Sequence, residues 1–192
     1  NVKILYAGKF DESKGFYELI KAFKLLEKKD NNVELELIGN LKEEDRPRVE
    51  ALVGDSKKIK IYNAVDQAHL GEIMRHKDIF ILPSYFEGLG LIAVEALGSG
   101  LRVVATEIEG LIELLGDKIN NSEIIEYIAM PTIYDTDKAV EEEKPAFVNR
   151  IVGALELMIE RTREQREIPA ELLEEIEHHS WKRKIEIIYK LL

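Results

Sequence analysis

Two acidic and two basic residues in this sequence have the chemistry and the spacing to hold a polar, anionic ligand. Glu87 lies in a glycine-bearing segment, and Glu95 lies in the apolar run that follows it. An ionised carboxylate among apolar neighbours is costly unless a hydrogen-bond donor reaches it. A ligand hydroxyl can be that donor; alternatively, Glu95 pairs with a nearby Arg or Lys, or its face of the helix is wet. Lys9 and Lys14 add two cations in a polar loop near the start of the chain.

The segment 78–100 contains both acids. Residues 79–82 form a short apolar run typical of a buried strand, Gly88 and Gly90 follow in a turn-forming segment, and residues 89–97 favour a helix. In an open α/β sheet this junction lies at the carboxyl ends of the strands, where ligands bind. The backbone amides of Gly88, Leu89, Gly90 and Leu91 are then free donors at a helix start, suited to a diphosphate.

The first loop, residues 8–15, follows a strand-like run and opens a helix. It is not a Walker loop, because Lys14 precedes its glycine and no Ser or Thr follows in the metal-binding place. Two lysines in a polar loop are often only solvated surface. If the first strand lies beside residues 78–82, however, both lysines face the helix start at Gly90, and the two segments form one anion pocket.

Composition sets the outer limits. The chain has 192 residues, of which 45% are hydrophobic and 33% charged, and this suits one domain with a sizeable core. A net charge of -10 argues against binding of nucleic acid or anionic lipid. The absence of cysteine excludes disulfides and fits a cytoplasmic protein. The chain opens on a strand-like run with neither Met nor a leader, so we expect a fragment of a longer protein.

Strand-like and helix-like segments alternate along the first part of the chain. Strands are predicted at 2–7, 33–38, 58–62, 78–82 and 101–105, and helices at 14–28, 43–53, 67–76, 89–97 and 109–115. This alternation implies right-handed crossovers and a parallel sheet covered on both faces. The predicted fold class is α/β, a Rossmann-like doubly wound parallel sheet.

The later part of the chain is less regular. Residues 120–130 fit a short helix, a strand, or one after the other, and residues 131–145 are expected to be a polar connector. An amphipathic helix is predicted at 147–163 and another at 181–192, with a possible helix start at Pro169. We expect one domain over 1–192, in which 146–192 is a helical C-terminal extension.

Three motifs together resemble a known family. They are Gly8-Lys9-x4-Lys14-Gly15, Pro83-Ser84-x2-Glu87-Gly88-x-Gly90-x4-Glu95-Ala96, and Gly100-x-x-Val103-Val104-Ala105-Thr106. They resemble the retaining group 1 glycosyltransferases, which include sucrose-phosphate synthases and bacterial mannosyl and glucosyl transferases, and Ser180-Trp181…Ile188-Tyr189 resembles that family's last helix. The resemblance implies the GT-B fold, two Rossmann-like domains with a cleft between them, of which this chain is similar to the C-terminal, donor-binding half.

The resemblance also implies roles. Lys9 and Lys14 would neutralise the leaving diphosphate, and Glu87 would bind hydroxyls of the transferred sugar. Glu95 would bind the ribose hydroxyls, while the nucleobase would rest near Tyr62, Asn63, Ala64 and Val65. The implied donor-binding residues are Gly8, Ala64, Val65, Gly88, Gly90, Leu91, Ile92 and Glu95.

The implied reaction is transfer of a sugar from a UDP- or GDP-sugar to a glycan, glycolipid or polymer, with retention of configuration. The leaving phosphate itself would help deprotonate the acceptor, so that neither a protein nucleophile, a metal nor a cofactor is required. The implied partners are the nucleotide-sugar donor, an N-terminal acceptor domain missing from this chain, and the acceptor. The expected location is the cytoplasm, or the inner membrane face if the missing domain binds there, and this fragment alone is expected to be inactive.

The sequence departs from the family pattern at several positions. Lys9 stands where the family usually has Arg, and Glu107-Ile108-Glu109-Gly110 replaces a paired glycine motif. These departures motivate an alternative, a degenerate, non-catalytic nucleotide-sugar-binding or scaffolding module. A third hypothesis is an epimerase or phosphorylase on the same fold. A phosphorylase would need covalently bound pyridoxal phosphate, and no lysine in the sequence stands out as its attachment site.

Two further motifs invite a metal interpretation. Asp135-Thr136-Asp137 spells a metal-binding Asp-x-Asp, but its place in a polar connector favours turn chemistry. His178 and His179 are adjacent and would point to different helix faces, which favours a surface or packing role.

Overall fold

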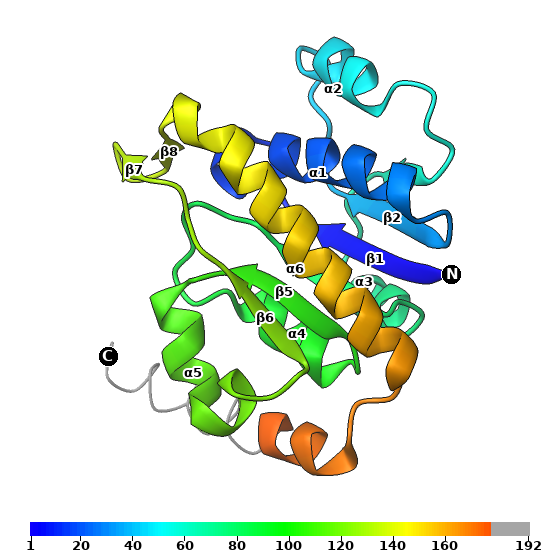
Figure 1. The fold of residues 1–192 in the computed structure, drawn as a ribbon, viewed down its shortest axis with the longest axis vertical. Coiled ribbons are helices and arrows are strands. Elements are labelled where there is room, and N and C mark those ends of the chain that lie inside the picture. The colour runs from blue at the N-terminus through cyan, green and yellow to red at the C-terminus, as the bar shows by residue number, and fades with distance from the viewer. Residues whose placement is uncertain (178–192) are drawn as a thin grey trace.

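The computed structural model describes residues 1–177, and its centre is one parallel sheet of six strands (Figure 1). The strand order is β3-β2-β1-β4-β5-β6, and each neighbouring pair is parallel. The strands are β1 (Val2–Ala7), β2 (Val33–Ile38), β3 (Ile59–Tyr62), β4 (Ile79–Leu82), β5 (Arg102–Thr106) and β6 (Ile125–Ile128). The Rossmann-like, doubly wound fold class predicted from the sequence is confirmed.

Helices cover both faces of the sheet. The helix bounds are α1 (Phe16–Lys29), α2 (Arg46–Val53), α3 (Gln67–Met74), α4 (Leu91–Gly98), α5 (Glu109–Asn120) and α6 (Lys144–Glu164). Figure 1 shows α6 running diagonally across one face beside α1, with α3 and α4 behind the sheet. Buried side chains of α1, α2 and α6 join one core, and those of α3, α4 and α5 join the other.

The strands separate the two cores because successive side chains point to opposite faces. In β1, Ile4 and Tyr6 enter the α1–α6 core, whereas Leu5 and Ala7 enter the α4–α5 core. All four residues of β4 are buried, as expected for a central parallel strand. The short apolar run that the sequence displays at 79–82 is therefore a central strand of the sheet.

Several helix boundaries differ from the prediction, and three of the differences have clear local reasons. Asp11 caps a 3-10 turn, η1 (Glu12–Lys14), and Gly15 at φ 63° separates this turn from α1. α2 begins at Arg46 with Pro47 in its first turn, where the missing amide hydrogen has no cost. α5 runs on to Asn120, because the chain resumes helical geometry after a break at Gly116 with φ 72°.

The segment 120–145 is more ordered than the sequence suggested. In its first part, α5 ends at Asn120 and the sixth strand, β6, follows, so the strand is the open alternative that the structure bears out. The polar connector expected at 131–145 does link β6 to α6, but it contains the hairpin β7 (Ile133–Tyr134) and β8 (Lys138–Ala139), then the 3-10 turn η2 (Glu141–Glu143). Figure 1 places this hairpin beside the amino end of α6.

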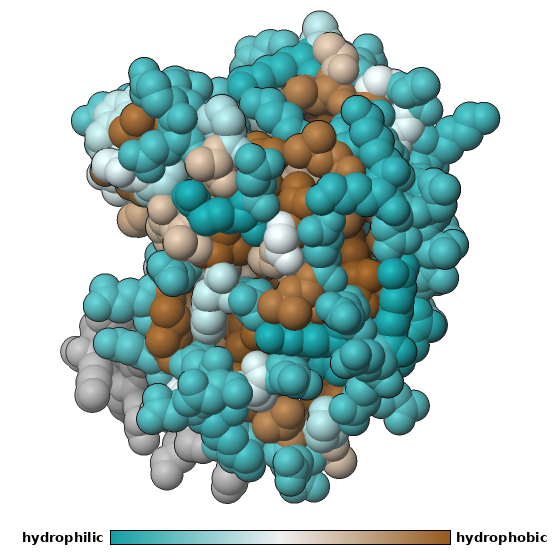
Figure 2. Space-filling view, viewed as in Figure 1, coloured by the Kyte–Doolittle hydropathy of each residue, from teal (hydrophilic) through white to brown (hydrophobic). Residues whose placement is uncertain are grey.

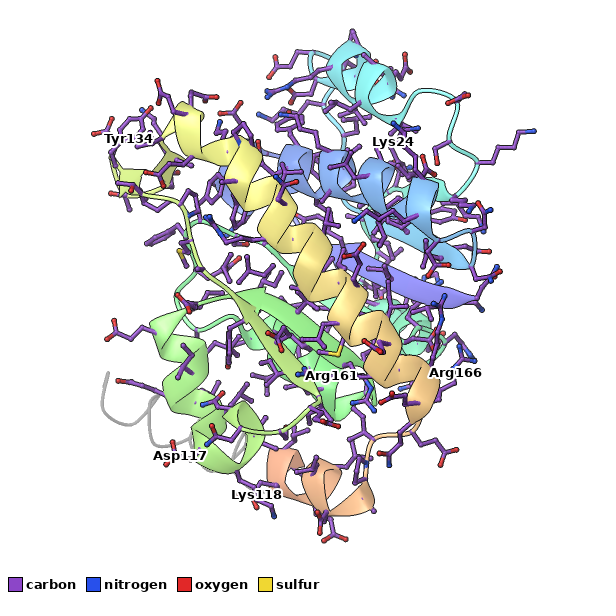
Figure 3. All side chains as sticks on the ribbon, viewed as in Figure 1. Lys24, Asp117, Lys118, Tyr134, Arg161 and Arg166 are labelled. Carbon is purple, nitrogen blue, oxygen red and sulfur yellow. The ribbon has the colours of Figure 1, made fainter. Side chains whose placement is uncertain are left out.

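α6 packs on one face of the sheet and contributes buried side chains to the core there. Phe147, Ile151 and Leu155 are fully buried in the α1–α6 core. Arg161 on α6 pairs with Glu126 of the edge strand β6 at 2.8 Å (Figure 3). On the face seen in Figure 2, hydrophobic residues are visible between hydrophilic ones.

No helix within residues 1–177 is long and apolar enough to cross a membrane. A further helical segment occupies 170–177. The predicted helix 181–192, together with His178, His179 and Trp181, lies outside the described residues.

Candidate functional site

Loops that follow β1, β2 and β4 meet at the carboxyl edge of the sheet, and glycines allow their close approach. A side chain at Gly15 would place its Cβ 2.1 Å from the carbonyl oxygen of Pro83. At Gly39, a Cβ would lie 2.2 Å from the carbonyl oxygen of Gly8. Both distances are shorter than any tolerable contact with backbone, so only glycine lets these loops pack.

The central loop between β4 and α4 is anchored at its beginning. Ser84 and Tyr85 are buried, and the amide of Tyr85 donates a 2.8 Å hydrogen bond to the carbonyl oxygen of Ser13 in η1. The buried hydroxyl of Thr106, at the end of β5, donates to the carbonyl oxygen of Ser84 at 2.6 Å. The loop is therefore fixed by the end of β4, by the turn η1 that follows β1, and by the end of β5.

Lys14 and Glu87, which are far apart in the sequence, form an ion pair at this edge. The Nζ of Lys14 lies 2.8 Å from Glu87 Oε1 and donates to the carbonyl oxygen of Phe86 at 3.0 Å. The hydroxyl of Ser84 also donates to Glu87 Oε1, at 3.0 Å. Each charged side chain is 21% exposed, so the pair is reachable from solvent but largely covered.

Lys9 lies on a separate part of the same edge. It is exposed and has no ion pair within residues 1–177. It borders a pocket of about 620 Å³ that reaches from the first loop to the loop after β3. Residues that line the pocket include Gly8, Lys9, Asn40, Ala64, Val65, Leu70 and Ile92. Four of the predicted site residues besides Lys9 are thus brought together here, and Tyr62, 48% exposed, ends β3 at the same edge.

Of the alternatives left open for Glu95, the structure favours a partly wet helix face, because its side chain is half-buried. α4 is not apolar on every side, and Glu95 faces α3, where the side-chain amide of Gln67 donates to Glu95 Oε1 at 3.1 Å. Both residues line a depression of about 280 Å³, and its wall shares Leu70 with the larger pocket. Glu95 also lies one helical turn from the pocket residue Ile92, on the same helix face.

Gln67 was missed by the sequence analysis. The feature of the sequence that could have indicated Gln67 is the preceding Asp66. Asp66 caps α3 by accepting a hydrogen bond from the amide of His69. That cap places Gln67 in the first turn of a helix that starts at the carboxyl edge, although only the packing of α3 on α4 brings it to Glu95.

The start of α4 has the geometry expected of an anion-binding helix end. Gly90 adopts φ 59°, which a glycine tolerates. Within the described chain, the amides of Gly88, Leu89, Gly90 and Leu91 have no backbone acceptor. The loop rests on α5, because a Cβ on Gly110 would lie 2.4 Å from the carbonyl oxygen of Gly88.

The charges at this edge are mixed. Glu107 and Glu109 are exposed after β5, as their sequence position suggested. Burial, followed by the charges of Asp11 and Glu87, raises the pKa of Tyr6, whose hydroxyl therefore stays protonated and donates to the carbonyl oxygen of Lys9. Tyr6 thus holds the backbone of the first loop rather than acting as an acid.

The Asp-x-Asp motif lies in the turn of the β7–β8 hairpin. Asp135 and Thr136 adopt positive φ, and Asp135 pairs with Lys138 at 3.2 Å. Across residues 1–177, no group of three or more His, Asp or Glu side chains is placed to hold a metal ion. The turn chemistry expected of this motif accounts for its geometry.

Comparison with known proteins gives consistent similarities. The family model of the glycosyl transferases group 1 matches residues 1–127. D-inositol 3-phosphate glycosyltransferase of Arthrobacter sp. (strain FB24) is 29% identical over 119 residues, which cover 59% of this chain and 28% of that protein. The match therefore spans less than a third of that relative's length.

Solved structures share the fold at low sequence identity. Sucrose-phosphate synthase from Thermosynechococcus elongatus superposes with a TM-score of 0.71 at 20% identity, over 99% of this chain and 45% of that one. The C-terminal domain of a group 1 glycosyl transferase from Francisella tularensis superposes with a TM-score of 0.63 at 22% identity, over 94% of this chain and 83% of that one. The GT-B half expected from the sequence motifs is the fold observed.

Proposed function

Because the chain belongs to the glycosyl transferases group 1 family, we propose that it is the donor-binding half of a retaining glycosyltransferase. The observation that carries the proposal is the 620 Å³ pocket at the carboxyl edge. Lys9 borders this pocket, and the carboxylate of Glu95 lies one helical turn from its wall. A nucleotide needs a cation for its phosphates and a hydroxyl acceptor for its ribose, and these two residues supply them.

The proposed roles follow from these positions. The diphosphate of a UDP- or GDP-sugar binds near Lys9, Lys14 and the free amides at the start of α4, which stabilise the charge that develops as the phosphate leaves. Glu95 accepts hydrogen bonds from the ribose, and the base rests beside Ala64 and Val65. Glu87 binds hydroxyls of the transferred sugar.

The proposed reaction uses neither metal nor protein nucleophile. The leaving phosphate assists removal of the acceptor's proton, and the sugar keeps its anomeric configuration. The acceptor, a glycan, glycolipid or polymer, is held by an N-terminal domain outside this chain. The proposed location is the cytoplasm, with any membrane contact made by that other domain.

Calorimetric titration with UDP, GDP, UDP-glucose and GDP-mannose, without metal, tests the proposal. We expect saturable binding of one nucleotide series, and loss of at least about tenfold in affinity in Glu95→Ala because a charge-assisted hydrogen bond is removed. Glu72→Ala is the control, since Glu72 is exposed on α3 away from Glu95. Equal affinities in both variants would contradict the assigned ribose site.

A second function is motivated by the charges at the edge. Lys9 gives a point charge where the family usually has the bidentate Arg fork, and Glu107 and Glu109 add negative charge. A degenerate binding module would retain nucleotide affinity in the 192-residue chain but show no transfer in the full-length protein with any common donor. Transfer by the full-length protein would exclude this alternative.

A further inference from the structure

The cation of Lys14 is already neutralised by the protein. Its Nζ contacts two acceptors, Glu87 Oε1 at 2.8 Å and the carbonyl oxygen of Phe86 at 3.0 Å. Glu87 therefore already engages one of the three N–H donors through which Lys14 could bind a ligand phosphate. Lys9, in contrast, is exposed and borders the pocket without an internal anion in the described chain. A diphosphate can thus meet Lys9 first, whereas at Lys14 it competes with the carboxylate of Glu87.

Displacement leaves Glu87 short of partners. It would keep the hydroxyl of Ser84, 3.0 Å from Oε1, and lose the ammonium that balances its charge. A carboxylate that is 21% exposed is partly removed from water, so the loss of its cation carries a cost. Sugar hydroxyls can offset that cost by hydrogen-bonding the freed carboxylate, whereas a bare diphosphate offers no donor for it.

The loop is built so that this exchange can be local. Ser84 and Tyr85 are buried and tied to Thr106 and Ser13. Beyond them, Phe86 is 51% exposed, and no atom lies within 4 Å of the place a Gly88 Cβ would occupy. The side chain of Glu87 is itself partly exposed beside these two positions, so it can leave Lys14 by a change of rotamer without disturbing the strand ends.

We propose that Glu87 is a specificity-determining residue that selects a sugar-bearing diphosphate over the bare diphosphate by competing for Lys14. The inference rests on the proposed function and adds to it a role for the ion pair. After transfer, the product lacks the sugar that held Glu87, so the carboxylate returns to Lys14 and weakens the hold on the nucleoside diphosphate. Substrate binding and product release are thereby set by one side chain.

The test compares Glu87→Gln with Glu107→Gln in the 192-residue chain. Glu107→Gln is the matched control, because it removes one negative charge from an exposed position at the same sheet edge without breaking an ion pair. The probes are inorganic pyrophosphate and two matched pairs, UDP with UDP-glucose and GDP with GDP-mannose. Dissociation constants are measured by calorimetry at constant ionic strength.

We expect Glu87→Gln to bind pyrophosphate and the bare nucleotide about threefold to tenfold tighter than the control variant does, since one charge-assisted contact no longer competes. The matching nucleotide-sugar should not tighten, so the ratio of the two dissociation constants shifts. The proposal is overturned if Glu87→Gln behaves like Glu107→Gln, or if bare and sugar-bearing ligands tighten equally.

Failure of the proposed function gives a different result. In that case nucleotides bind no better than pyrophosphate, and Glu95→Ala changes none of the affinities. If nucleotides do bind in a Glu95-dependent way while Glu87→Gln fails to tighten pyrophosphate, the proposed function survives and the competition for Lys14 does not.

Discussion

The side-chain amide of Gln67 lies 3.1 Å from Glu95 Oε1, and this contact joins α3 to α4 beside the pocket at the carboxyl edge. One carboxylate oxygen is thereby engaged within the protein, and the contact orients the other. A neutral amide can orient a carboxylate without neutralising its charge. Gln67 is therefore suited to position Glu95 for a ligand rather than to replace the ligand.

Gln67→Ala is expected to weaken nucleotide binding. Loss of one hydrogen bond to a charged group corresponds to about 1.5–3 kcal/mol at most, and less at this exposed position, so we expect a drop of roughly threefold to tenfold. Titration of the variant beside Glu72→Ala measures the effect. Unchanged affinity in Gln67→Ala, with Glu95→Ala still defective, would show that Glu95 needs no such support.

Gly15→Ala should strongly destabilise the fold. The residue has φ 63°, and an added Cβ would lie 2.1 Å from the carbonyl oxygen of Pro83. Backbone strain and this clash together should lower the free energy of unfolding by about 2 kcal/mol or more. Gly153→Ala in α6 is the matched control. No atom lies within 4 Å of its Cβ position, and there we expect a gain of about 0.5–1 kcal/mol. Urea unfolding measures both, and equal signs would contradict the account.

Thr106→Val tests the anchor of the central loop. The substitution keeps the shape of the side chain but leaves the buried carbonyl oxygen of Ser84 without its 2.6 Å donor. We expect a loss of about 1–3 kcal/mol in the free energy of unfolding, because an unsatisfied buried acceptor keeps its full desolvation cost. Urea unfolding beside Thr136→Val, which changes an exposed hairpin residue, separates the loop anchor from a general effect of the substitution.

Two of the buried tyrosines, Tyr6 and Tyr85, predict a loss of stability at alkaline pH. Burial raises the pKa of Tyr6 and Tyr85, and the charge of Glu18 adds to the effect at Tyr85. The unfolded chain releases these protons near pH 10, while the folded chain retains them, so stability is complete below about pH 10 and falls above it. Each tyrosine contributes a slope of about 1.4 kcal/mol per pH unit in that range.

Tyr85→Phe should therefore make the alkaline loss of stability shallower. Denaturant unfolding between pH 8 and about pH 11 measures the slope. Tyr62→Phe is the control, since this side chain is 48% exposed and meets water in both states. A slope that stays the same in Tyr85→Phe would rule out the contribution of this tyrosine.

A shortened chain tests the role of α6. The family model matches only residues 1–127, yet Phe147, Ile151 and Leu155 fill the core over one sheet face. A chain that ends at residue 143 should lose its cooperative unfolding transition, because that face is then uncovered. A chain of residues 1–177 is the control. A sharp thermal transition in the shorter chain would mean that the matched segment folds alone.

Local patterns in the sequence were enough to determine the fold class and the positions of the charged loops. The apolar run of β4, the alternation in β2 and the glycine-bearing segment before α4 each follow from neighbouring residues. Strand period, helix period and turn preferences act over a few residues, so a single sequence displays them. The same reasoning placed Lys14 and Glu87 at one sheet edge.

Only the tertiary structure decided what these residues contact. The exposure and the partner of Glu95 stayed open because they depend on α3, whose distance from α4 is set by packing and not by the residues around Glu95. The contact of Lys14 with Glu87 requires β1 and β4 to be neighbours in the sheet. The segment 131–145 looked like a connector because its hairpin is only a pair of two-residue strands, too short for any periodicity. Side-chain partners depend on which elements meet in space, and that information is distributed over the whole chain.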